Sequence, residues 1–181
     1  MSLSHAILGL LSIQSMSGYD LKHLAFEQTI AHFWQADQAQ IYRTLDKMAE
    51  AGWISSQLEI QDSRPNRKIY SLTDRGHAEL ERWLRTDQPL PVYREAFLVQ
   101  LFFAEQLPPD VILDQIERHI AGHQARLLTY ENIPLPQLDD TAIENREIFW
   151  RLTLDFGIAL EKTYLAWLEM CKKVIGDIPA P

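Results

Sequence analysis

Residues 37–75, DQAQIYRTLDKMAEAGWISSQLEIQDSRPNRKIYSLTDR, decide the fold, because a helix and two strands follow one another there without a break. Asp37 can cap a helix over 38–52, and Gly52 supplies its C-terminal stop. The apolar stripe of this helix consists of Ile41, Leu45 and Met48. A single narrow stripe predicts a helix that packs inward on one side and leaves its other side exposed.

The polar side of this helix carries side chains that can reach bases or phosphates from a DNA groove. These are Gln38, Gln40, Tyr42, Arg43 and Lys47. Glutamine can read adenine, but exposed glutamine is common, so both interpretations stay open for Gln38 and Gln40. Tyr42 can donate to a phosphate or complete the helix packing. For Arg43 and Lys47 the alternative is a solvated helix face.

Residues 53–61 and 68–73 alternate apolar and polar side chains and are predicted to be strands. The connection between them, 62–67, is rich in turn-forming residues and includes Asn66. The cations at this hairpin are Arg64, Arg67, Lys68 and Arg75, against Asp74 alone, which gives a local charge of +3. Such a tip suits a wing that touches the DNA backbone; a solvated basic turn is the alternative.

Helices are predicted on both sides of this stretch. Residues 4–14 suit a short buried helix, and a turn at 17–20 leads into a second helix over 21–33. Thr73 is a predicted N-cap for a closing helix over 74–86. Three helices, a two-stranded wing and a closing helix are the order of a winged helix-turn-helix, whose third helix reads the groove.

Two prolines within residues 88–92 interrupt helix formation and indicate a domain boundary. We therefore expect a DNA-binding winged helix-turn-helix domain over 1–88 and an all-helical dimerisation domain over 89–181. The helices of the second domain are expected over 94–106, 108–132 and 141–173. The fold class is thus mainly α.

The last predicted helix is apolar along two seams and has to be covered on both. Three helices offer little cover, which predicts a homodimer; the alternative is a monomer whose second seam packs on its own first domain. The expected dimer contacts are Trp150, Leu154, Phe156, Leu160, Tyr164, Trp167 and Leu168.

Composition narrows the function classes. The chain is 46% hydrophobic, but no apolar run approaches the roughly 20 residues of a membrane span, and a single cysteine forms no intrachain disulfide, so a cytoplasmic location is expected.

The net charge of -8 opposes DNA binding at first sight. However, residues 1–88 hold nine Lys and Arg against eleven Asp and Glu, whereas residues 89–181 hold eight Lys and Arg against fourteen Asp and Glu. The excess of acidic residues therefore lies mainly in the second half of the chain. Neither a phosphate-binding glycine loop nor a nucleophile with a base partner is present, so we expect no enzyme and no cofactor.

Three other groups have competing interpretations. His119 and His123 have a spacing that can hold a metal ion, but no matching cysteine or carboxylate shares their face, so two solvated histidines are expected. Cys171 has only two lysines beside it to lower the pKa of its thiol, which disfavours redox sensing. An aromatic cluster could line an effector pocket or be ordinary core, and comprises Phe97, Leu98, Phe102, Phe103, Trp150 and Trp167.

Three strings in this order resemble the PadR family of transcriptional regulators: GYDL at 18–21, IYRTL at 41–45 and RKIYSLTDRG at 67–76. The likeness covers about the first 85 residues. The length and the helical second domain resemble the longer subgroup with a virulence-activator-type C-terminal domain.

The resemblance implies a dimer that binds an inverted-repeat operator in double-stranded DNA, usually as a repressor, and that a small aromatic or hydrophobic effector releases in some members. By the same similarity Tyr19 belongs to the positioning helix, Tyr42 and Arg43 to the recognition helix, and residues 64–68 to the wing. Asp37 and Ala39 stand at variable family positions, so the operator sequence is not implied. The acidic second half motivates an alternative, a protein-interaction adaptor that uses the winged helix as a docking surface.

Overall fold

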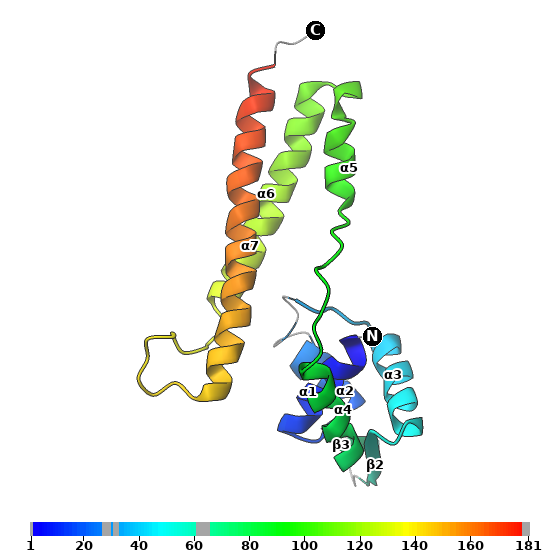
Figure 1. The fold of residues 1–181 in the computed structure, drawn as a ribbon. Coiled ribbons are helices and arrows are strands. Elements are labelled where there is room, and N and C mark those ends of the chain that lie inside the picture. The colour runs from blue at the N-terminus through cyan, green and yellow to red at the C-terminus, as the bar shows by residue number, and fades with distance from the viewer. Residues whose placement is uncertain (1, 27–29, 31–32, 61–65, 179–181) are drawn as a thin grey trace. The chain divides into compact units, whose positions relative to one another are not determined.

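The computed structural model describes residues 2–26, 30, 33–60 and 66–178. The chain divides into two units, Met1–Leu90 and Pro91–Pro181, each of which is described by itself (Figure 1). The sequence placed its boundary two residues earlier, between 88 and 89.

The first unit combines short helices with a small sheet (Figure 1). Its elements are α1 Ser2–Ile13, β1 Met16–Ser17, α2 Gly18–Asp20, η1 Leu21–Phe26, α3 Gln38–Glu50, β2 Ile54–Glu59, β3 Arg67–Leu72 and α4 Asp74–Leu84. Among the described residues the strands form one antiparallel sheet in the order β1-β3-β2. The predicted winged helix-turn-helix order is confirmed.

One apolar core holds this unit together. The predicted stripe of α3 is fully buried, with Ile41 and Leu45 at 0% and Met48 at 1% exposure. It packs with Leu8 of α1 and Tyr70 of β3 in the same cluster. Because burial of each such side chain contributes about 1.5–3 kcal/mol, this core fixes the orientation of α3 and leaves its opposite face exposed.

The wing and the closing helix meet at one hydrogen-bonded corner. Gly52 ends α3 with a φ of 71°, a conformation that glycine adopts without strain. The Thr73 hydroxyl donates to the Gly52 carbonyl oxygen at 2.8 Å and accepts from the Gly76 N–H at 3.1 Å. The predicted N-cap at Thr73 is therefore confirmed, and it also ties the start of α4 to the end of α3.

Two features of the first unit differ from the sequence expectation. Strand β1 is only two residues long, too short to produce an alternating pattern, and it exists because its backbone pairs with β3. The second helix was expected over 21–33, but its described part ends at Phe26, and Ile30 and Phe33 are not helical. Residues 21–26 form a wide π-helical turn, which rotates later side chains away from the 3.6-residue spacing that the prediction used.

The second unit is helical throughout its described part. Its elements are α5 Ala96–Phe102, a 3₁₀ turn η2 Ala104–Gln106, α6 Pro109–Glu131 and α7 Asn145–Gly176. Helices α6 and α7 lie side by side (Figure 1), and the core between them includes Ile116 and Leu168, both 0% exposed. The predicted start of the last helix at Thr141 is four residues early, because Glu144 and Glu147 form the capping box that begins α7. No helix in the described ranges is long and apolar enough to cross a membrane.

Candidate nucleic-acid interface

Helix α3 is fixed at its amino end by its own cap. Asp37 Oδ1 accepts a hydrogen bond from the Gln40 backbone N–H at 2.7 Å, and the Asp37 N–H donates to Gln40 Oε1 at 3.3 Å. This capping box confirms the predicted N-cap and satisfies two backbone donors that a helix start leaves open. It also occupies the side-chain oxygen of Gln40, so a two-bond contact from Gln40 to adenine would require breaking the cap.

The outer face of α3 presents two cations. Arg43 and Lys47 stand one helical turn apart, are exposed, and form no ion pair with another residue in the described part of the chain. They line a shallow hollow of about 390 Å³ with Leu3, Trp34, Gln35, Gln40 and Thr44. Asp46 and Glu50 are also exposed on α3, but neither of them lines this hollow.

Tyr42 docks α3 on the preceding helix. A Cβ atom added at Gly18 would lie 2.6 Å from Tyr42 Cε1, so the ring rests directly on the α2 backbone and a side chain at position 18 would displace it. The packing role that the sequence allowed for Tyr42 is therefore present. Tyr19, next to Gly18, is exposed, with its ring centroid 4.3 Å from that of His23. Gln38 is exposed in the first turn of α3.

An ion-pair network connects the wing to α2. Arg67 at the start of β3 donates from Nε to the carboxylate of Glu59 on β2, and its Nη1 lies 3.6 Å from Asp20 Oδ2. Asp20 also accepts from the Ser17 hydroxyl at 2.8 Å and completes the cap of α2. The guanidinium of Arg67 is thus shared between two carboxylates, unlike Arg43 on α3.

The sequence prediction did not include Asp20 or Glu59. Two signals were available: Ser17 and Asp20 have capping-box spacing, and Glu59 stands opposite Arg67 in the hairpin register. Elsewhere in the wing, Lys68 is exposed with its amine 5.4 Å from the Tyr70 ring centroid, and Asn66 is exposed as well. Arg64 lies outside the described residues.

The predicted dimer residues occupy different environments in the second unit. Leu154 and Leu168, at 1% and 0% exposure, pack inside their own chain, so the sequence prediction that they face a partner does not fit the fold. Trp150, Tyr164 and Trp167 are partly buried, whereas Phe156 and Leu160 are exposed. The seam that turns outward also contains Phe149, Leu152, Met170 and Val174.

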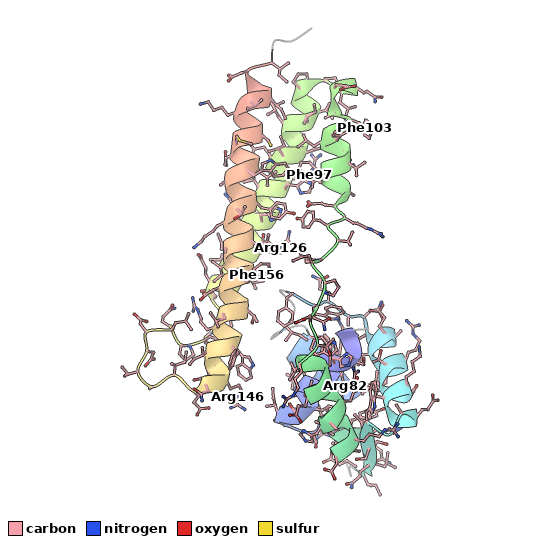
Figure 2. The ribbon with its side chains drawn as sticks, viewed as in Figure 1. Arg82, Phe97, Phe103, Arg126, Arg146 and Phe156 are labelled. Atoms are coloured by element: carbon pink, nitrogen blue, oxygen red, sulfur yellow. The ribbon has the colours of Figure 1, made fainter. Side chains whose placement is uncertain are left out.

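Two expectations about the second unit need correction. His123 is not solvated: it is 4% exposed and pairs with Glu161 at 2.5 Å, a carboxylate from α7 that helix spacing could not reveal. The aromatic cluster is split, because Phe97 is buried against His119 whereas Phe102 and Phe103 are exposed and contact each other. Figure 2 labels Phe97 and Phe103 near opposite ends of α5.

A cation-bearing helix docked on a preceding helix, followed by a β-hairpin wing, defines a winged helix-turn-helix DNA-binding regulator. The chain belongs to the PadR-like family of transcriptional regulators. The family model for this group matches residues 7–82, and the model described as "Virulence activator alpha C-term" matches residues 93–176. The family resemblance expected from the sequence is therefore confirmed.

A curated relative and two solved structures extend the likeness over nearly the whole chain. The negative transcriptional regulator PadR of Bacillus subtilis is 31% identical over 172 residues, which cover 92% of this chain and 93% of the relative. The crystal structure of Bacillus subtilis PadR with operator DNA has a TM-score of 0.83 at 30% identity, covering 97% of this chain and 99% of that one. Its complex with p-coumaric acid has a TM-score of 0.77 at 29% identity, covering 98% and 100%.

The chain is accordingly a transcriptional regulator, and its family consists of DNA-binding regulators rather than enzymes. These relatives lend no support to the alternative of a protein-interaction adaptor.

Proposed function

We propose that the protein is a cytoplasmic repressor that binds an inverted-repeat operator as a homodimer and that a small aromatic or hydrophobic effector releases it. The observation that carries the operator part is the cationic face of α3, where Arg43 and Lys47 are exposed with no carboxylate partner among the described residues. Lysine and arginine in this position gain affinity by neutralising phosphates, and arginine can also read guanine.

The docking of α3 supports this role. Tyr42 on Gly18 and the Asp37 cap hold the helix by contacts that do not involve Arg43 or Lys47. Both cations can therefore enter a groove without any loss of helix packing. In this proposal Gln38 and Tyr19 contact the DNA beside them, as the sequence suggested.

The wing contributes in two ways. Lys68 and Asn66 are exposed and are proposed to touch the DNA backbone, together with Arg64. Arg67 already contacts Glu59 and Asp20, so its proposed DNA contact is weaker, and it mainly holds the wing against α2. The operator complex of Bacillus subtilis PadR supports this assignment by similarity.

The proposed dimer rests on the outward seam of α7. Phe149, Phe156 and Val174 are 68%, 64% and 61% exposed along one helix, a surface that soluble proteins normally cover. Leu160 is exposed on the same seam, and the partly buried Trp150, Tyr164 and Trp167 border it. A symmetric pair would cover it and would present two copies of α3 to an inverted repeat.

The proposed effector release rests on similarity to Bacillus subtilis PadR, which has been crystallised with p-coumaric acid. The repressor direction rests on the name of the same relative, a negative transcriptional regulator. A single-ring aromatic acid is accordingly the ligand class to test first.

Operator binding is tested by fluorescence anisotropy with the DNA upstream of the protein's own gene, titrated at several salt concentrations. We expect Arg43→Ala and Lys47→Ala each to weaken binding about tenfold and to lower the salt slope by about one, because each removes a phosphate or base contact. Arg85→Ala is the matched control, since Arg85 pairs with Glu81 on α4. Unchanged affinity in the double variant, or no binding of the wild type at low salt, would refute the proposal.

A further inference from the structure

The side of α6 that carries Gly122 has a hollow of about 340 Å³, which we name the α6 hollow. Gly122 forms its floor: a Cβ atom added there would meet nothing within 4 Å. Arg118 and Arg126 stand one helical turn before and after Gly122, and Figure 2 labels Arg126 on this helix. Glycine in a helix interior lowers stability by about 1 kcal/mol relative to alanine. The residue that leaves this space open therefore destabilises α6.

The lining of the α6 hollow is strongly cationic for a chain of net charge -8. It contains two arginines and two histidines and no carboxylate. Arg118 forms no ion pair with another residue in the described ranges, and Arg126 reaches only Glu161, at 3.6 Å. The α6 hollow therefore offers donors and positive charge with few acceptors, which is the environment that an anion requires.

His123 supplies a buried polar group in the wall. It is 4% exposed, and its Nδ1 bonds to the buried carboxylate of Glu161. This bond fixes the ring, while Nε2 has no hydrogen-bond partner within the described part of the chain. A buried polar atom without a partner is costly and rare, so its place in the wall of a hollow indicates a ligand atom that completes it.

Burial and the charged residues around the α6 hollow also shift the pKa of His119. Burial lowers the pKa of His119, and the charges of His123, Arg118 and Arg126 lower it further, against an opposing contribution from Glu95. A neutral His119 stacks on Phe97 with a centroid separation of 3.8 Å, which gives this wall a flat aromatic character. The described residues contain no group of three metal ligands, so a bound metal ion is not indicated here.

We propose that the α6 hollow binds the carboxylate of a small organic acid. Arg118 and Arg126 hold the carboxylate above Gly122, and the buried ring of His123 stands in the wall beside it. The volume suits a single-ring acid. The choice of an aromatic acid rests on the effector part of the proposed function, whereas the anion site stands on the residues named above.

The test is isothermal titration of the full chain, without DNA, with p-coumarate and separately with inorganic phosphate. We expect p-coumarate to bind the wild type, and Arg118→Gln and Gly122→Leu each to weaken binding at least tenfold. Gly122→Leu fills the α6 hollow while improving helix propensity, so it should fold. The matched controls are Lys173→Gln and Gln124→Leu, which remove a charge or add the same side chain away from the lining, and both should bind as the wild type does.

The outcomes separate this inference from the proposed function. If p-coumarate binds the wild type and both variants equally, the α6 hollow is not its site, although the effector part of the proposed function survives. If phosphate binds and depends on Arg118 while p-coumarate does not bind, the site takes an inorganic anion and the carboxylate assignment is wrong. If neither anion binds, the inference fails, and operator affinity measured by anisotropy still decides the proposed function independently.

Discussion

Helices α3 and α7, one from each unit of the chain, place apolar and charged side chains in opposite ways. In the first unit the apolar stripe of α3 is sealed in a core, and the charges of Arg43 and Lys47 stay in solvent. In the second unit α7 leaves Phe156 exposed while a hydrogen-bonded polar pair, His123 with Glu161, is buried. The first unit thus carries its proposed binding surface on a complete core. The second has apolar surface left to cover and polar atoms left to satisfy, so partners and ligands are expected to act there.

The largest change in the free energy of unfolding is expected from a substitution in the buried core of the first unit. Leu45→Ala should lower the free energy of unfolding by about 4 kcal/mol, because it removes a fully buried side chain and leaves a cavity. Urea denaturation followed by circular dichroism measures it. The control is Leu58→Ala on β2, where the leucine is 65% exposed and the change should stay below about 1 kcal/mol. Equal losses in the two variants would contradict a core centred on α3.

The second largest effect is expected from the buried, hydrogen-bonded pair of His123 and Glu161. His123→Leu leaves the Glu161 carboxylate buried with only a distant partner in Arg126, and should cost about 3 kcal/mol. Replacing both members, His123→Leu with Glu161→Met, should recover most of this loss, because no unpaired charge remains. The measurement is the same denaturation experiment. A double variant as unstable as the single one would show that packing, and not charge, governs the site.

A smaller effect is expected at the outward seam of α7. Phe156→Ala should raise the dissociation constant of the proposed dimer about tenfold, or about 1.4 kcal/mol, because it removes apolar area that the partner would cover. Sedimentation equilibrium measures the change. Gln124→Ala on α6 is the control and should dimerise normally. A wild type that is monomeric at all accessible concentrations would refute the dimer.

The smallest effect concerns the contact of α1 with α4 in the first unit. Hydrogen bonds from Arg82 and His5 lower the pKa of Glu79 from 4.5 to about 2. Because this pKa is lower in the folded state, the contribution of Glu79 is complete above pH ~4.5 and is lost as the pH falls toward 2. Arg82 is largely exposed, so Glu79→Gln should cost only about 1 kcal/mol at pH 7. The difference between wild type and variant should fall to less than half at pH 3 in urea denaturation, and a difference independent of pH would exclude this linkage.

The sequence predicted those parts of the fold that depend on neighbouring residues. The Asp37 cap, the α3 stripe and the Thr73 cap follow from local spacing, and each is confirmed. The pairing of β1 with β3 and the bond between His123 and Glu161 join residues far apart in the chain, so no local pattern reveals them. The same limit applied to the dimer residues, because spacing shows that α7 has two apolar seams but not which one α6 covers.

Within the candidate interface, spacing identified the exposed cations of α3 but not their contrast with Arg67. Arg43 and Arg67 have the same side chain and both lie in regions expected to meet DNA. Only the fold shows that Arg67 is shared by Glu59 and Asp20, whereas Arg43 has no such partner among the described residues. Two arginines with the same charge in the sequence are therefore not equally available to bind a DNA phosphate.

The network of Arg67, Asp20 and Ser17 has a consequence for the evolution of binding preference. The same short helix that holds Arg67 also carries Gly18, on which Tyr42 rests, so the wing and the groove-facing helix share one support. Substitution of Ser17 or Asp20 should shift the reach of the wing relative to α3. Selection for a new target sequence can therefore act on residues that never touch nucleic acid, and a screen limited to groove-facing positions would miss them.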